Sequence, residues 1–223
     1  DACHALGASY RVNKNHYKVG SCKHADISTF SLHPLKTITT GEGGIVTTNS
    51  KKIYEKLLNL RSLGIKRKKK HWEYNVEGYG LNFRLNEIQS ALGISQLKKI
   101  NLFIFKKKKI YNIYKKELNK IKGISMPKYK NDILPSYHLC LAFLEKKNIR
   151  YKEKFIKYML KKKIMIQYHY IPVYKFNIFK DKYIGNRAEN YYKSAISLPI
   201  FYNLTLEKQY KVIKNIKLFF SNI

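Results

Sequence analysis

Apolar and polar positions along the first fifty residues predict two strands joined by a tight turn. Residues 25–31 alternate and are rich in β-prone side chains, and residues 45–48 are mostly β-branched, so both stretches predict strands. The glycines between them, at positions 41, 43 and 44, predict the turn. Residues 1–24 predict the end of a strand and then a loop, within which the polar residues 10–20 form a hairpin-like excursion.

A helical period of apolar side chains follows this region and predicts helices over residues 50–64, 86–97 and 100–121. Ser50 and Asn86 are suitable N-caps for the first two helices. The third helix is expected to carry its lysines on the outer face. Residues 65–84 show no period, so we expect a solvated, lysine-rich loop there.

Gly, Pro, Asn and Asp gather between residues 123 and 135, which is typical of a domain edge. We therefore expect a large domain in residues 1–122 and a small α+β domain in residues 123–223. In the small domain, the pattern predicts strands over 137–144 and 165–170, and helices over 152–162, 188–195 and 205–219. Thr205 is the expected cap of the last helix, and residues 197–199 are expected to form a turn.

Composition adds a strong positive charge to this picture. The 223 residues include 45 Lys and Arg against 14 Asp and Glu, a formal net charge of +31. Such a charge is typical of proteins that bind nucleic acid or anionic membranes. Arginine, the usual residue for bidentate contacts to phosphates and bases, occurs only at positions 11, 61, 67, 84, 150 and 187. We therefore favour compositional drift towards lysine, with nucleic-acid binding as the alternative.

The cysteines and the absence of long apolar runs suggest a reducing compartment. Cys3, Cys22 and Cys140 have neither CxxC spacing nor a neighbouring His pair, so we expect free thiols and no metal site. No apolar run approaches the roughly 18 residues of a membrane span, and no signal peptide is recognisable. These features lead us to expect a cytoplasmic location without a membrane partner. Because the chain begins at Asp1 without Met or a helix cap, we expect a fragment.

Lys36 differs from the other lysines in its surroundings. It is the only lysine between Lys23 and Lys51, and its neighbours are small, hydroxylated or apolar. A lysine that attacks a carbonyl must be neutral, and desolvation lowers the pKa of such an amine. We therefore favour a carbonyl-bearing cofactor at Lys36, pyridoxal 5'-phosphate (PLP), over a solvated surface lysine.

PLP also needs a carboxylate at its ring nitrogen and hydrogen-bond donors for its phosphate. Asp1 lies one strand-loop-strand excursion before Lys36, and Ser31 stands at the end of the preceding strand, so both are candidates. The alternatives stay open, because a lone Asp is usually a cap or a surface carboxylate and Ser31 could simply end its strand.

Several motifs stand in a fixed order along the chain: DACHALGA at 1–8 with SLHPLKTITTGEGG at 31–44, GLNFRLNEIQSALG at 80–93, QYHYIPV at 167–173, and SLP at 197–199. Together they resemble the PLP-dependent sugar-nucleotide aminotransferases of the DegT/DnrJ/StrS type, most closely the branch on the pseudaminic acid route. The resemblance implies an α/β fold, the C-terminal portion of a fold-type I PLP-dependent transferase. We expect a partial mixed sheet flanked by helices, plus a small α+β C-terminal lobe.

The resemblance also implies a role for each matching residue. Lys36 would hold the cofactor covalently and move the proton between the cofactor carbon and the substrate carbon. Asp1 would pair with the ring nitrogen, His4 would lie near the phenolic oxygen, and Ser31 would bind the phosphate. Cofactor and substrate contacts in the partner subunit are implied for Asn82, and sugar-nucleotide contacts for Gln167, Tyr168, His169 and Tyr170.

The implied reaction transfers the amino group of L-glutamate to a 4-keto-6-deoxy UDP-N-acetylhexosamine in a homodimer. Lys36 favours transamination, because a related branch with histidine at this position performs dehydration instead. The alternatives are an aminotransferase for another keto-sugar nucleotide, a basic nucleic-acid-binding protein and a decayed remnant. Family members also carry an N-terminal segment with a helix that helps hold the phosphate, so this polypeptide alone could be inactive.

Overall fold

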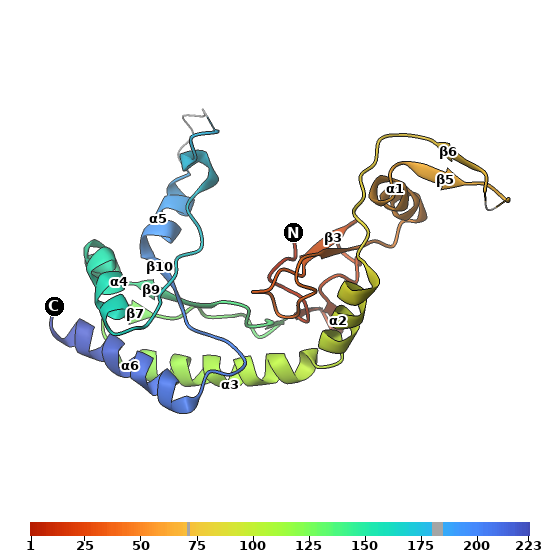
Figure 1. The fold of residues 1–223 in the computed structure, drawn as a ribbon. Coiled ribbons are helices and arrows are strands. Elements are labelled where there is room, and N and C mark those ends of the chain that lie inside the picture. The colour runs from red at the N-terminus through yellow and green to blue at the C-terminus, as the bar shows by residue number, and fades with distance from the viewer. Residues whose placement is uncertain (71, 180–184) are drawn as a thin grey trace. The chain divides into compact units, whose positions relative to one another are not determined.

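The computed structural model describes residues 1–70, 72–179 and 185–223, which form two compact units (Figure 1). The first unit comprises Asp1–Ile104 and Asn131–Ser136, and the second comprises Phe105–Lys130 and Tyr137–Ile223. Helix α3 (Ile100–Leu118) therefore begins in the first unit and lies mostly in the second. The domain boundary expected between residues 122 and 123 stays a prediction.

The N-terminal hairpin of the first unit forms where it is expected. β1 (Ser9–Val12) and β2 (Asn15–Lys18) pair antiparallel, and β8 (Ile133–Leu134) adds to the other edge of β1, which gives the order β2-β1-β8. Because β8 pairs with β1, residues 131–136 belong to the first unit although they are far from it in the sequence.

A second antiparallel pair presents Lys36. β3 (Ser28–Ser31) pairs with β4 (Gly44–Thr47), and Ser31 lies opposite Gly44. Both predicted strands are confirmed, although β3 is shorter than expected at its start. Residues 32–43 connect the two strands and carry Lys36. Both ends of this loop are therefore fixed at the same end of the paired strands.

Two capped helices follow this sheet, as the sequence predicts. α1 (Lys51–Arg61) is capped by Ser50, and α2 (Glu87–Leu97) by Asn86, each of which accepts a backbone N–H bond from the first turn. Neither helix contains a buried residue. Their ends are therefore stabilised by caps, each of which contributes about 1 kcal/mol.

The prediction of a loop over residues 65–84 is wrong in part, because this segment contains two strands. β5 (Ile65–Arg67) and β6 (Tyr74–Val76) pair antiparallel within it, with Ile65 opposite Val76. Each strand has only three residues, and all but Ile65 are exposed. A strand this short with little burial has no alternation between a core face and a solvent face, so the pattern did not reveal it.

The second unit packs its helices on a three-stranded antiparallel sheet of order β10-β9-β7. Its strands are β7 (Ile124–Ser125), β9 (Cys140–Leu144) and β10 (Ala195–Leu198). Its further helices are α4 (Lys152–Lys161), α5 (Asn186–Ser194) and α6 (Leu206–Ser221), with 3-10 helices η1 (Lys146–Tyr151) and η2 (Val173–Lys175). Thr205 caps α6 as expected. α6 lies beside α3 (Figure 1), and Gln209 Nε2 donates to the Ile110 carbonyl at 2.7 Å.

Two expectations for the second unit are wrong. Ser197 and Leu198 belong to β10 and do not form a turn, because all four residues of this strand are buried and the pattern shows no alternation. Residues 165–170 do not form a strand. Gln167 alone makes an isolated antiparallel bridge with Ser197.

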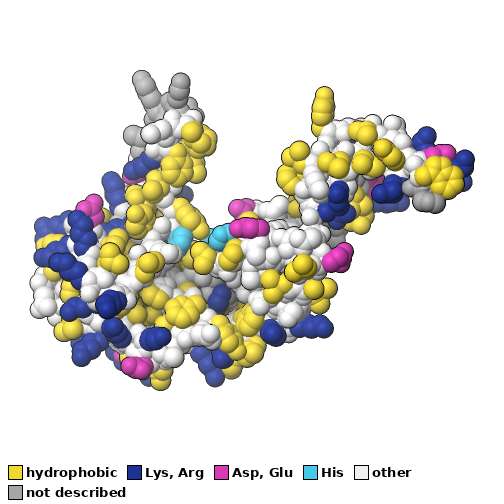
Figure 2. Space-filling view, in the orientation of Figure 1, with side chains coloured by type: hydrophobic (Ala, Val, Ile, Leu, Met, Phe, Trp, Pro, Cys, Tyr) yellow, Lys and Arg dark blue, Asp and Glu magenta, His cyan; other side chains and the backbone are white. Residues whose placement is uncertain are grey.

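Lysines of α3 are exposed with one exception. Lys106, Lys108 and Lys109 point to solvent, whereas Lys107 is only 7% exposed and burial lowers its pKa. On the face drawn in Figure 2, Lys and Arg side chains are interspersed with apolar and uncharged ones. Within the described ranges, no helix is long and apolar enough to cross a membrane, and no cluster of His, Cys, Asp and Glu suits a metal ion. Cys3, Cys22 and Cys140 are free thiols.

Candidate active site

The loop that carries Lys36 is closed at its base by backbone hydrogen bonds. The Leu32 N–H donates to the Gly43 carbonyl at 2.8 Å, and the Thr40 N–H donates to the Leu32 carbonyl at 3.1 Å. Leu32 and Ile38 anchor the loop in the core, each 2% exposed. Lys36 itself lies on a turn closed by its N–H and the His33 carbonyl at 2.9 Å, and its side chain is half-buried.

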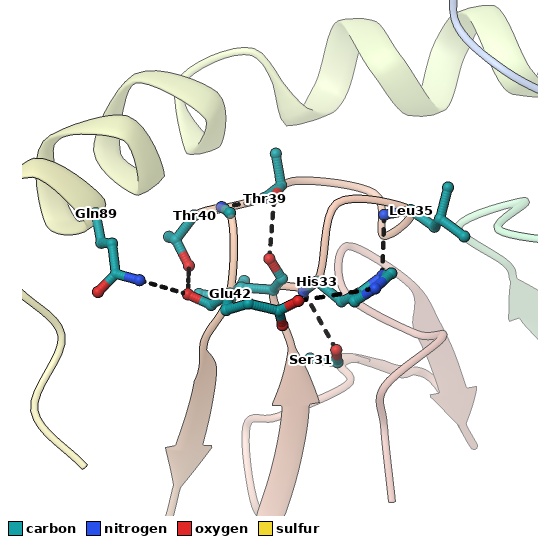
Figure 3. A network of polar contacts seen from close by, with 9 residues as sticks. Ser31, His33, Leu35, Thr39, Thr40, Glu42 and Gln89 are labelled. Carbon is teal, nitrogen blue, oxygen red and sulfur yellow. Dashed lines mark hydrogen bonds and ion pairs between the residues drawn. The ribbon is translucent and has the colours of Figure 1, made fainter. Parts of the chain in front are cut away.

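Hydroxyl groups hold the second half of this loop (Figure 3). Thr39 Oγ1 donates to the Leu32 carbonyl at 3.0 Å and accepts from the Gly41 N–H at 2.9 Å. Thr40 Oγ1 donates to the Glu42 carbonyl at 2.7 Å. The two threonines therefore satisfy backbone groups of the loop from within it, which explains the Thr-rich sequence after Lys36.

Ser31 and His33 organise the first half of the loop. Ser31 Oγ accepts from the His33 N–H at 3.3 Å, and His33 Nδ1 accepts from the Leu35 N–H at 3.2 Å. A neutral imidazole whose Nδ1 accepts carries its proton on Nε2, which lies 3.9 Å from Glu42 Oε1. A hydroxyl that accepts one bond still has its own proton to donate, so Ser31 Oγ keeps a donor.

Asp1 and His4 lie on a segment that runs beside β3. The Ala2 N–H donates to the Thr29 carbonyl at 2.8 Å, and Thr29 shares a face of β3 with Ser31 because strand side chains alternate. Asp1 Oδ1 accepts from the Cys3 N–H at 2.8 Å. Ser136 Oγ fixes the His4 carbonyl at 2.8 Å. The segment with Asp1 is therefore hydrogen-bonded to β3, the strand that ends at Ser31 and continues into the loop with Lys36.

Asn82 is exposed on a segment that pairs with the end of α1. It forms an isolated antiparallel bridge with Ser62. The Leu81 N–H donates to the Leu60 carbonyl at 2.8 Å, and the Phe83 N–H donates to the Arg61 carbonyl at 3.0 Å. These backbone bonds hold Asn82 beside the end of α1, and the residue is exposed on the surface of the first unit.

Two glycines allow the Asn82 segment to approach this closely. A Cβ on Gly80 would lie 2.3 Å from the Gly64 nitrogen, and one on Gly64 would lie 1.9 Å from the Gly78 carbonyl oxygen. Gly64 also has φ +71°, which L-residues rarely adopt.

We expect Gly64→Ala to destabilise the protein and to loosen residues 78–83. The positive φ alone costs about 1–2 kcal/mol, and the backbone overlap adds to it. Thermal unfolding and hydrogen exchange of these residues measure both effects. Gly78→Ala is the matched control, because a Cβ there meets nothing within 4 Å. Equal stability of the two variants would show that the two backbones do not touch at Gly64.

In the second unit, Ser197 holds the segment implied to line the sugar-nucleotide site. Gln167 and Ser197 exchange two backbone bonds, of 3.2 and 2.6 Å, and His169 Nδ1 lies 2.7 Å from Ser197 Oγ. Ser197 is buried in β10, so it fixes both the backbone and the His169 ring. The sequence motif around Ser197 pointed to this region, but not to this role.

Tyr168 lies beside Lys152. The Lys152 ammonium lies 5.4 Å from the centre of the Tyr168 ring and 4.9 Å from that of Tyr192, and it donates to the Tyr192 carbonyl. Burial lowers the pKa of Lys152. Tyr170 is exposed as a whole residue, but partial desolvation of its hydroxyl raises the pKa of that group. The roles of Gln167, Tyr168, His169 and Tyr170 stay predictions.

Residues 1–217 match the DegT/DnrJ/EryC1/StrS aminotransferase family, and the chain belongs to it. It is 39% identical over 219 residues to the UDP-4-amino-4,6-dideoxy-N-acetyl-beta-L-altrosamine transaminase of Campylobacter jejuni, covering 96% of this chain and 56% of that protein. It is 32% identical to the GDP-perosamine synthase of Escherichia coli O157:H7, covering all of this chain and 58% of that protein. The chain therefore spans a little over half the length of these relatives.

Solved structures confirm the predicted fold class. The aminotransferase PseC of Helicobacter pylori, described as involved in the biosynthesis of pseudoaminic acid, matches with a TM-score of 0.90 and 34% identity. The match covers 100% of this chain and 59% of PseC. The PLP-form of Spr1654 from Streptococcus pneumoniae matches with a TM-score of 0.87 at 23% identity, which shows the shared fold.

Proposed function

We propose that the protein is a PLP-dependent aminotransferase that transfers the amino group of L-glutamate to a 4-keto-6-deoxy UDP-N-acetylhexosamine. The chain belongs to an aminotransferase family, and one observation supports the proposal within that family. Lys36 is half-buried on a loop whose base and length are held by hydrogen bonds. A lysine that forms a covalent bond at a defined position needs such a rigid support.

The side chains of the first unit fit PLP by their chemistry. The set contains an amine at Lys36, a carboxylate at Asp1 and a hydroxyl at Ser31 that can donate to phosphate. When bound, PLP supplies an electron sink for the carbon that exchanges the amino group. Lys36 Nζ binds the cofactor and moves the proton, Asp1 holds the proton of the ring nitrogen, and His4 orients the ring.

The substrate side of the proposal rests on Asn82 and residues 167–170. Asn82 is exposed on a firmly paired segment, so a second copy can receive it in a homodimer. The name of the Campylobacter jejuni relative supports a UDP-linked 4-amino sugar as the product, for surface polysaccharide or glycan biosynthesis. The free thiols support the reducing cytoplasm as the location.

Peptide mapping after borohydride reduction tests the proposal. Reduction makes a covalent link between PLP and a lysine permanent, so we expect the label on the peptide that contains Lys36 in the purified, PLP-loaded protein. Label on Lys23 or Lys51 instead would contradict the role of Lys36. Absence of any label would contradict the aminotransferase itself.

A GDP-linked keto sugar is the second candidate acceptor, because the GDP-perosamine synthase is 32% identical to this chain. Turnover of matched UDP- and GDP-linked 4-keto-6-deoxy sugars with L-glutamate separates the two. We expect the higher kcat/KM with the UDP-sugar.

A further inference from the structure

One side chain joins α2 to the Lys36 loop. Gln89 Nε2 donates to the Glu42 carbonyl at 3.1 Å across 47 positions of the sequence (Figure 3). At its other end, Gln89 Oε1 accepts from the Asn86 N–H at 3.2 Å, and Asn86 Oδ1 accepts from the Gln89 N–H at 2.8 Å. The amide of Gln89 is therefore fixed at both ends, as an acceptor within α2 and as a donor to the loop.

The Glu42 carbonyl is the group of the Lys36 loop that accepts the hydrogen bond from Gln89. It also accepts from Thr40 Oγ1 at 2.7 Å, so both of its lone pairs are used. Thr40 is 3% exposed, and its N–H closes the loop base at Leu32. A displacement of Glu42 would therefore move Thr40 and the base of the loop on which Lys36 lies.

A second contact brings α2 against the same loop. A Cβ on Gly93 would lie 2.9 Å from Thr40 Cγ2. Gly93 follows Gln89 by four residues, so the two share one face of the helix. Glycine inside a helix costs about 1 kcal/mol relative to alanine, and the close approach to Thr40 gives a physical reason to accept that cost.

We propose that Gln89 is a positioning residue for Lys36, which acts by fixing the Glu42 carbonyl from α2. The proposal rests on the proposed function of Lys36, but the link between helix and loop does not. A capping role alone does not require glutamine, because glutamate serves equally as the acceptor at this helix position. Compared with glutamate, the amide of glutamine adds an N–H group that can donate to the Glu42 carbonyl.

Two substitutions separate the two ends of this side chain. Gln89→Glu keeps the acceptor for the Asn86 N–H and removes the donor to Glu42. Gln89→Lys keeps a donor that can reach the carbonyl and removes the acceptor. Gln96→Glu makes the same chemical change on the same helix, away from these contacts, and is the matched control.

Hydrogen exchange of the amides at positions 40–43 in the purified, cofactor-free protein is the first measurement. Loss of one hydrogen bond speeds local opening by up to about tenfold, so we expect an increase of about two- to tenfold in Gln89→Glu and near-normal protection in Gln89→Lys and Gln96→Glu. Unchanged exchange in Gln89→Glu, or an equal increase in Gln96→Glu, would overturn the proposal.

Retention of PLP on Lys36 is the second measurement, followed by the absorbance near roughly 400 nm. We expect Gln89→Glu to lose the cofactor about tenfold faster on dilution and to lower kcat more than it changes KM for the sugar, with recovery in Gln89→Lys. Faster exchange with normal retention would overturn the positioning role. Borohydride labelling of another lysine would instead refute the proposed function and leave the helix-to-loop link intact.

Discussion

Lys36→Ala is expected to abolish transamination while the fold persists. Removing a residue that bonds covalently to the reacting system costs on the order of 10⁴-fold or more in kcat, because neither the attachment nor the proton transfer has a substitute. Among the described residues, none forms a hydrogen bond or ion pair with Lys36 Nζ. Truncation therefore leaves no buried group without its partner, and we expect the free energy of unfolding to change by about 0.5 kcal/mol or less.

The measurement compares turnover and thermal unfolding in three variants. Lys36→Arg keeps the positive charge but cannot attach the cofactor, so it should be as inactive as Lys36→Ala. Lys51→Ala removes an exposed lysine whose only described ion pair is with Glu55 at 4.0 Å, and it should retain full activity. Substantial turnover in Lys36→Ala would show that another lysine performs the chemistry.

Local signals allowed the elements around this loop to be predicted. Ser50, Asn86 and Thr205 cap helices where expected, because a cap acts on backbone groups within its own first turn. The glycines after Lys36 predicted the turn into β4 for the same local reason. The position of Lys36 between two strands was therefore predictable from short-range sequence features.

Features that depend on distant partners could not be predicted in this way. β10 is buried on both faces, so its pattern does not distinguish a strand from a turn before a proline. The bond from Gln89 to Glu42 spans 47 positions. The spacing of Asn86 and Gln89 does predict a capping box, but nothing local shows that the second half of the same amide holds the lysine loop.

Exposed apolar side chains of the first unit are a related case. Tyr79, Phe83 and Ile88 are 99%, 70% and 82% exposed, on or beside the segment that carries Asn82. A helical period predicted α2 correctly, but none of the residues of this helix is buried. Periodicity thus predicts the helix without predicting how far its apolar side chains are buried.

Asp1→Asn is expected to lower kcat by at least about tenfold while the local structure is kept. A hydrogen bond to a charged group contributes about 1.5–3 kcal/mol, and each 1.36 kcal/mol is tenfold in rate. Without the carboxylate, the proton on the cofactor ring nitrogen loses its counter-charge and the electron sink weakens. Asn still has a side-chain oxygen that can accept the Cys3 N–H, as Asp1 Oδ1 does at 2.8 Å.

The isosteric change therefore separates charge from position in the segment beside β3. The Ala2 N–H bond to the Thr29 carbonyl involves backbone only and should survive. Asp26→Asn, at an exposed site in the same unit, is the control for a lost surface charge and should leave kcat unchanged. Steady-state kinetics and the absorbance of the bound cofactor measure both variants. If Asp1→Asn retains normal kcat with a normal spectrum, a carboxylate other than Asp1 holds the ring nitrogen.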